Sequence, residues 1–106
     1  MPKYLIEAAY TAEGLRGLQK DKATGRRQAL VKAVESLEGK VDAFYFSMGD
    51  RDVLAIVEAP DAVSIAALSL AASATGLVRI RTTALLSVEE VDRALEKKHN
   101  YRGPGA

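Results

Sequence analysis

The chain contains no cysteine and a single histidine among its 106 residues. Without cysteine there is no disulfide framework, thiolate zinc site, iron–sulfur cluster or cysteine nucleophile, and a reducing compartment is the natural setting. The one histidine, His99, falls in a C-terminal stretch that supplies no fixed partner for a catalytic base or a haem ligand. We therefore expect neither a metal nor a cofactor.

A surplus of charge of one sign is also missing. Fifteen Lys and Arg residues against fourteen Asp and Glu residues leave a net charge of +1, which argues against broad attraction to nucleic acid or to an anionic membrane. The longest uncharged stretch, residues 62–78, is short and polar for a membrane span, and the N-terminus lacks the apolar core of a signal peptide. We expect a soluble, cytoplasmic protein with no nucleic-acid or membrane partner.

The chain has no GxGxxG, P-loop, HExxH or GxSxG pattern, so nucleotide-binding, metalloprotease and hydrolase functions have no motif to support them. Its hydrophobic content of 48% is nevertheless enough for one globular core. Function must therefore be sought in the apolar patterns and in the few polar residues placed among them.

A regular series of apolar patterns runs along the chain. Alternation with a period of two predicts strands at residues 3–10, 40–48, 52–58 and 77–86. Between residues 11 and 22, Gly14 and Gly17 predict a short or irregular helix. The main helices are expected from residue 24 to a stop at Gly39, from an N-cap at Asp61 to residue 76, and after the capping box of Ser87 and Glu90.

This order of elements is that of the ferredoxin-like βαββαβ arrangement with an extra C-terminal helix. It predicts an α+β fold with a four-stranded antiparallel sheet and two main helices on one face. Residues 1–96 would form the single domain. Residues 97–106 would form a flexible tail, because nothing in them can nucleate a core.

The sheet is more apolar than a solitary domain requires. In the third strand, Val53, Ala55 and Val57 alternate with further aliphatic residues, so both faces of the sheet require cover. The helix that follows is apolar nearly all round and should be buried on two sides. The C-terminal helix or another subunit could provide this cover, and a contiguous apolar sheet face usually marks an interface or a ligand groove. We predict a homo-oligomer, a dimer or larger.

Charged residues interrupt this apolar face on the fourth strand. Arg79 and Arg81 should share the open face of the sheet with Glu7 of the first strand. They predict either a solvated or interfacial ion cluster or an anion pocket on that face.

The turn between the second and third strands is the first candidate site. Gly49 can take a positive φ and Asp50 can close an Asx-type turn, so turn formation accounts for both residues. Alternatively, Asp50 and Asp52 form a carboxylate pair in a cavity and either bind a cation or act as acid and base. Two carboxylates without a nearby histidine are a weak metal signal, so no metal is expected there.

The second candidate is an anion site at the start of the first main helix. Arg26 and Arg27 follow Gly25 in a segment, residues 16–32, with six basic residues and one acidic residue. Unpaired amides, the helix dipole and the guanidinium groups all attract anions, so phosphate or carboxylate ligands fit. Alternatively, the two arginines pair with an acidic residue such as Glu13, or with a neighbouring subunit, and bind no ligand.

The tyrosines form the third candidate. Tyr10 and Tyr4 lie on one face of the first strand, and Tyr45 lies on the second strand. They either flank a pocket at the end of the first strand or fill the core between sheet and helices, with their hydroxyl groups reaching water or backbone.

Three segments carry a family resemblance: "MPKYLIEAAYTAEGLRGL", "AVESLEGKVDAFYFSMGDRDVLAIVEAPD" and "VRIRTTALLSVEEVDRAL". Together they resemble the GYD domain family of small bacterial proteins over about residues 1–95. The family is similar in topology to dimeric α/β barrels, in which two ferredoxin-like sheets pack face to face, and this implies the oligomer expected above. In the family's hairpin, Gly49, Asp50 and Asp52 match the usual residues, whereas Arg51 replaces a tyrosine. The resemblance implies no particular reaction.

These patterns favour a non-enzymatic, homo-oligomeric module that binds a small anionic or amphipathic metabolite between the sheet and the helices. Its expected ligand-binding residues are Tyr10, Arg26, Arg27, Asp50 and Asp52. The alternative is a cofactor-independent enzyme of the barrel type, an isomerase or monooxygenase that uses Asp50 or a tyrosine. A purely structural oligomerisation module is the third possibility, and no catalytic residue is assigned.

Overall fold

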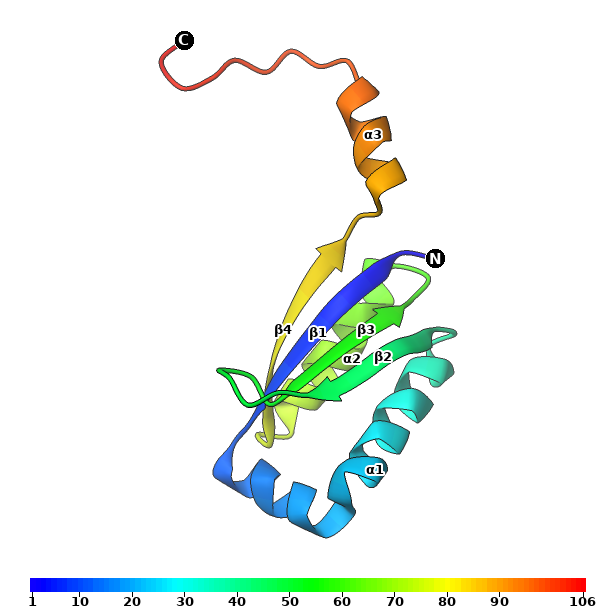
Figure 1. Ribbon diagram of the computed structural model, residues 1–106, viewed down its shortest axis with the longest axis vertical. Coiled ribbons are helices and arrows are strands. Elements are labelled where there is room, and N and C mark those ends of the chain that lie inside the picture. Colours follow the sequence, from blue (N-terminus) through cyan, green and yellow to red (C-terminus); the bar gives the residue numbers. More distant parts are fainter.

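The computed structural model describes residues 1–106 and contains four strands and three helices (Figure 1). Their order is β-α-β-β-α-β-α, which confirms the ferredoxin-like α+β fold with an extra C-terminal helix. The bounds are β1 Lys3–Tyr10, α1 Ala12–Ser36, β2 Lys40–Phe46, β3 Val53–Glu58, α2 Ala62–Ala74, β4 Val78–Leu85 and α3 Val88–Glu96. No helix combines the length and the apolar character needed to cross a membrane.

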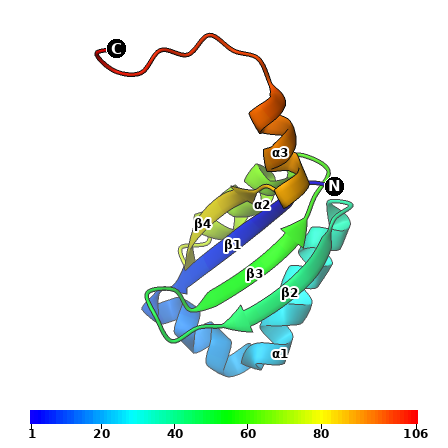
Figure 2. The same cartoon turned by 45° about the horizontal axis from the view of Figure 1, so that its top comes forward.

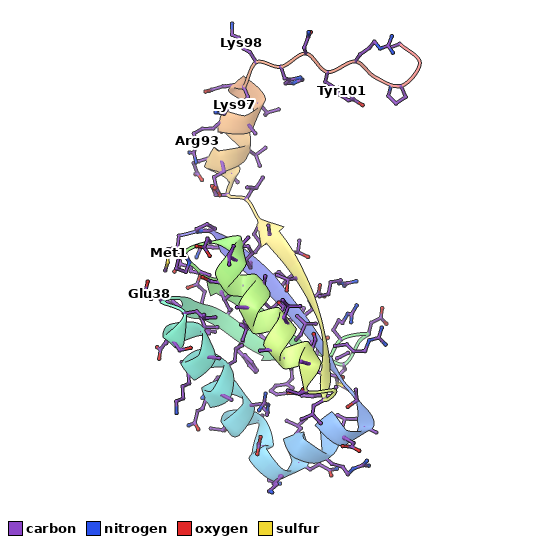
Figure 3. The ribbon with its side chains drawn as sticks, turned by 180° about the vertical axis from the view of Figure 1, so that it is seen from behind. Met1, Glu38, Arg93, Lys97, Lys98 and Tyr101 are labelled. Atoms are coloured by element: carbon purple, nitrogen blue, oxygen red, sulfur yellow. The ribbon has the colours of Figure 1, made fainter.

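The four strands form one antiparallel sheet in the order β2-β3-β1-β4. The two central strands therefore have partners on both sides, whereas β2 and β4 are edges. A register shift between Val41 and Ala43 makes β2 irregular where it pairs with β3. Helices α1 and α2 lie on one face of this sheet, and the other face carries no helix (Figures 1 and 3).

The core lies between the sheet and the two helices, and it is built from the inward positions of the strands. As the alternation predicts, Tyr4, Ile6 and Ala8 of β1 are buried, as are the corresponding residues of β3. Helix α1 contributes Val34 and α2 contributes Ile65. The connected core comprises Tyr4, Ile6, Val34, Ala55, Val57, Ala59 and Ile65.

This core is small for the length of the chain. Only 10 of the 106 residues are buried, and the radius of gyration is 16.7 Å, whereas a compact chain of this length has about 13 Å. The projection of α3 and the tail beyond the end of the sheet contributes to the large radius (Figures 1 and 2). The edge strands β2 and β4 contain no buried residue, and α2 buries only Ile65. Residues 97–106 contain no helix or strand.

Helix α1 consists of two segments, as the sequence predicts: the first ends in a break at Lys22, with φ 64° and ψ 169°, and the main segment follows. Gly14 and Gly17 do not interrupt the first segment. Gly14 is required by packing: a Cβ there would lie 2.0 Å from the carbonyl oxygen of Leu77. Thr11 also contacts Leu77, because its N–H donates a hydrogen bond to the same carbonyl oxygen at 3.0 Å. The Thr11 hydroxyl group accepts a hydrogen bond from the N–H of Gly14 and caps the helix.

Both predicted helix caps are present. The Asp61 carboxylate accepts a hydrogen bond from the N–H of Ser64 at 2.8 Å. Ser87 and Glu90 form the reciprocal bonds of a capping box, at 3.1 and 2.8 Å. These bonds hold the pKa values of Asp61 and Glu90 below their usual range, because a backbone N–H stabilises each carboxylate.

Candidate functional site

A cavity of about 140 Å³ lies between the helix-covered face of the sheet and helices α1 and α2. Of its 15 lining residues, 13 are hydrophobic. All four strands contribute, together with the second half of α1 and the middle of α2. The lining residues are Ile6, Ala8, Tyr10, Arg26, Ala29, Leu30, Ala33, Phe44, Val53, Ala55, Leu68, Ser69, Ala72, Val78 and Ile80.

Small side chains create the cavity. Ala8 and Ala55 occupy neighbouring inward positions on the central strands, Ala29 and Ala33 lie one turn apart on α1, and Ala72 lies on α2. Because each layer presents methyl groups where a Leu or Phe would fill the space, the sheet and the helices leave a gap. The gap is open to solvent beside Ala29, which is exposed, and its apolar walls accept apolar matter of matching size.

Arg26 is the only charged side chain in the cavity wall. Its Nη1 lies 3.5 Å from the Asp21 carboxylate, and both side chains are partly exposed. An exposed pair at this separation is weak, worth about 0–1 kcal/mol. The guanidinium group therefore keeps most of its hydrogen-bonding capacity for another anion.

The break at Lys22 places this arginine. Arg26 falls in the first turn after the break, where the second segment of α1 turns back along β2 (Figure 1). A second hollow, of about 190 Å³, shares Tyr10, Arg26, Ala72 and Val78 with the cavity. It also contacts Asp21, so Arg26 stands where the cavity opens toward the first segment of α1.

Ser69 supplies the other polar group of the wall, and it already has a partner. Its hydroxyl group lies 3.1 Å from the hydroxyl of Thr82 on β4. Tyr10 and Arg26 are the only ionisable residues that line the cavity, and arginine does not lose its proton in proteins. The wall is thus suited to hold an anion, and it offers little for proton transfer.

The two predicted arginines do not act on the same space. Arg27 lines a separate groove of about 240 Å³ on the outside of the molecule, between α1 and the edge strand β2. The other residues of this groove are Ala23, Thr24, Phe44, Tyr45 and Phe46. Only Arg26 reaches the cavity.

The aspartates of the β2–β3 hairpin lie outside the cavity. The Asp52 carboxylate accepts the backbone N–H of Tyr10 at 2.7 Å, and its own N–H donates to the Ala8 carbonyl at 2.8 Å. Asp50 is exposed. Arg51 is half-buried, and its Nε has no hydrogen-bond partner. The structure therefore places these residues in a turn anchored to β1.

The open face of the sheet is a second candidate surface. Leu5, Leu54 and Ile56 are only partly covered there. Glu7 pairs with Arg81 through two hydrogen bonds of 3.1 and 3.2 Å. The ion cluster predicted for this face thus forms between these two residues, and Arg79 makes no ion pair with Glu7. At one end, Lys3 pairs with Asp42 and Glu58, and the hydrogen bond to Asp42 raises the pKa of Lys3.

The expected cover for this apolar surface is not found within the chain. Helix α2 buries only Ile65, and its outer residues Val63 and Leu70 are exposed. Helix α3 lies beyond the end of the sheet and covers neither α2 nor the open face (Figures 2 and 3). The suggestion that α3 covers α2 in its own chain is therefore wrong.

Sequence reasoning identified Arg26 and Tyr10 but missed the aliphatic wall. The available signal was the alanine content of the two helices, above all Ala29, Ala33 and Ala72. Alanine in a helix usually reflects high helix propensity, so the pattern alone does not distinguish a close approach from a gap. Only the spacing of the layers shows that these methyl groups face empty space.

Comparison with known proteins agrees with this architecture. The GYD domain family matches residues 4–95, which spans every strand and helix except the first residue of β1 and the last residue of α3. Searches of curated proteins and of solved structures returned no match. The chain therefore belongs to the GYD domain family.

Proposed function

We propose that the protein is a cytoplasmic, homo-oligomeric module without enzymatic activity that binds a small amphipathic anion in the cavity between sheet and helices. One observation carries the proposal: a single charged group, the Arg26 guanidinium, stands in the wall of an otherwise apolar cavity of about 140 Å³. Pockets that combine an apolar lining with a few polar groups are typical of small-molecule sites.

The size of the cavity defines the apolar part of the ligand. A hole of about 150 Å³ lined by aliphatic and aromatic side chains binds benzene, so a ring or chain of about six carbons matches this cavity. The anionic group would lie at Arg26, where a carboxylate can take two parallel hydrogen bonds from the guanidinium. Short aliphatic and aromatic carboxylates are the ligand class that satisfies both conditions.

The scarcity of proton-transfer groups in the cavity wall favours binding over catalysis. An isomerase or monooxygenase without a cofactor requires a general base or acid within reach of the substrate. Asp50 and Asp52 lie elsewhere, and Tyr10 is the only residue in the wall with a proton to exchange. In a purely structural protein the cavity would bind no ligand. The titration described next distinguishes that case from ligand binding.

Calorimetric titration with benzoate and hexanoate tests the proposal. Arg26→Ala should weaken binding about tenfold, because loss of one charge-assisted contact costs about 1.5–3 kcal/mol in a protein and less at this partly exposed site. Arg16→Ala is the matched control, since Arg16 is exposed on α1 and lines neither the cavity nor the hollow beside it. Benzyl alcohol keeps the ring but lacks the charge. It should bind the natural protein more weakly than benzoate does, whereas the Arg26→Ala variant should bind the two compounds equally.

Equal binding of benzoate to the Arg26→Ala and Arg16→Ala variants would reject Arg26 as the anion contact. No binding of any carboxylate by the natural protein would reject the function. A substitution that fills the cavity with a larger side chain provides a second test, because it leaves no room for the ligand. Ala33→Leu should abolish binding while preserving the fold, because the added side chain enters space that is empty.

The oligomeric part of the proposal is supported by the open sheet face. Leu5, Leu54 and Ile56 remain accessible in a single chain, and a contiguous apolar face of this kind usually marks an interface. Sedimentation of the natural protein at micromolar concentration should show a dimer or a larger assembly. A stable monomer would contradict it.

A further inference from the structure

Helix α3 turns its apolar stripe away from its own domain. Val88, Val91 and Leu95 share one face of the helix at helical spacing. Their exposed fractions are 74%, 42% and 79%, which is unusual for the apolar stripe of an amphipathic helix. The helix itself projects beyond the sheet (Figure 1).

The opposite side of α3 is the one that faces the domain. Glu90 and Arg93 line a hollow of about 650 Å³ that also contacts Lys3, Ile56 and Leu85. Figure 3 shows Arg93 on the projecting helix, beyond Met1 at the end of the sheet. Because the polar side points toward its own chain, the sheet of the same chain cannot cover the apolar stripe in this arrangement.

The length of α3 adds a second argument for a partner. The helix has 9 residues, whereas isolated helices shorter than about 12–15 residues are marginal in water. Its capping box supports one end only. Burial of the stripe against another surface is the usual source of stability for such a helix.

A matching surface exists on the far side of the molecule. It is the groove between α1 and the edge strand β2 described above, which we call the α1–β2 groove; it is lined by Ala23, Thr24, Arg27, Phe44, Tyr45 and Phe46. Tyr45 is 69% exposed, and Phe44 and Phe46 pack edge to face with ring centroids 5.5 Å apart. An apolar, aromatic groove of this kind is suited to the apolar face of a helix.

The charges of the two surfaces are complementary. Helix α3 carries four acidic residues, Glu89, Glu90, Asp92 and Glu96, against one basic residue, Arg93. Arg27 of α1 lines the groove, and the basic residues Lys20 and Lys22 precede it along the helix. Opposite charge at the rim favours the correct partner and speeds association.

We propose that α3 of one copy docks in the α1–β2 groove of a second copy. The groove of the same chain is out of reach, because α3 begins directly after β4, which is the sheet edge opposite β2. Reciprocal exchange of the two helices gives a closed twofold dimer in which both stripes and both grooves are covered. This inference rests on the homo-oligomeric part of the proposed function and is independent of ligand binding.

Disulfide mapping tests the contact directly, since the chain has no cysteine of its own. Ala94→Cys is placed beside the stripe of α3, and Thr24→Cys is placed in the groove of a separate chain. Mixed under mild oxidation, the two single-cysteine proteins should form a mixed dimer, because a disulfide forms only where Cα atoms approach within about 7 Å. The expected rate is at least tenfold above those of the controls.

Two control mixtures test the other surfaces on which α3 could lie. Ala94→Cys is mixed with Ala66→Cys, on the exposed side of α2, and with Thr83→Cys, on the open face of the sheet. Faster cross-linking to either control than to Thr24→Cys would overturn the proposal. Equal rates for all three mixtures, or a mixed dimer in none, would overturn it as well.

Sedimentation provides an independent readout that separates this inference from the proposed function. Val91→Asp with Leu95→Asp should raise the dimer dissociation constant at least tenfold. Phe46→Asp should do the same, because Phe46 lines the groove and pairs with Val53 on the helix-covered side of the sheet. Val63→Asp, at a valine of α2 that is 78% exposed, should leave it unchanged. A dimer unaffected by the α3 changes would reject helix exchange while leaving benzoate binding and a sheet-face dimer intact.

Discussion

The carboxylate of Asp52 accepts a hydrogen bond from the backbone N–H of Tyr10 at 2.7 Å. This bond joins the β2–β3 hairpin to the last residue of β1, and the N–H of Asp52 strengthens the connection by donating to Ala8 at 2.8 Å. Because Tyr10 also lines the cavity, the hairpin helps to fix one end of the candidate site. Asp52 therefore positions this end of the cavity through its hydrogen bonds to the backbone of β1.

Replacing Asp52 by Ala should lower the free energy of unfolding by about 1–2 kcal/mol. The bond is charge-assisted and partly buried, and its loss leaves the N–H of Tyr10 without that acceptor. Asp50→Ala is the matched control, because this carboxylate is exposed and should change stability by less than about 0.5 kcal/mol. Urea unfolding of both variants gives the comparison, and equal midpoints would contradict the assigned role.

Gly14→Ala should destabilise the protein by about 1–3 kcal/mol, the usual cost of overpacking. The new Cβ would lie 2.0 Å from the Leu77 carbonyl oxygen, so the N-terminus of α1 must move away from the loop before β4. Gly17→Ala in the same helix meets nothing within 4 Å and should stabilise by about 0.5–1 kcal/mol through helix propensity. Thermal unfolding should move in opposite directions for the two variants.

Acid should weaken helix α3 before it affects the core. The pKa of Glu90 lies below its usual value of 4.5, chiefly because the N–H of Ser87 donates to its carboxylate. A carboxyl group whose folded pKa is lowered contributes stability above its unfolded pKa, and this contribution is lost as the pH falls from about 4.5 through the folded pKa. The stabilisation is therefore complete at neutral pH.

Amide chemical shifts of α3, followed from pH 7 to pH 3, measure this loss. In Glu90→Gln the side chain still caps the helix but does not titrate, so the change near Ser87 should be much smaller. An identical acid transition in both proteins would assign it to another group. Asp61, whose pKa is lowered by its bond to Ser64, provides the corresponding site at the start of α2.

Asp21→Ala should increase the affinity for benzoate severalfold. The Asp21 carboxylate lies 3.5 Å from Nη1 of Arg26 and competes with an anionic ligand for the guanidinium group. Removing it costs little stability, because an exposed pair of this kind contributes about 0–1 kcal/mol. Glu13→Ala, which removes an exposed acid from the same helix, is the control. Calorimetry that shows unchanged or lower affinity for Asp21→Ala would contradict the position assigned to the anion.

Local patterns predicted most of the secondary structure. The alternation in residues 3–10 defined β1 and its buried face, and the caps at Asp61 and Ser87 marked the starts of α2 and α3. Such features depend on neighbours within a few residues, so the sequence contains them directly. The break of α1 at Lys22 falls at the end of the irregular segment expected for residues 11–22. The sequence did not reveal that Gly14 serves a contact with Leu77, which is distant along the chain.

The order of elements, the two-sided apolar character of β3 and the helix caps were determined by the sequence alone, since periodicity and capping act over a few residues. The cavity, the separation of Arg26 from Arg27, the bond between Asp52 and Tyr10, and the outward position of the α3 stripe were decided only by the tertiary structure. Each depends on the distance between layers that are far apart along the chain, and no local pattern encodes that distance.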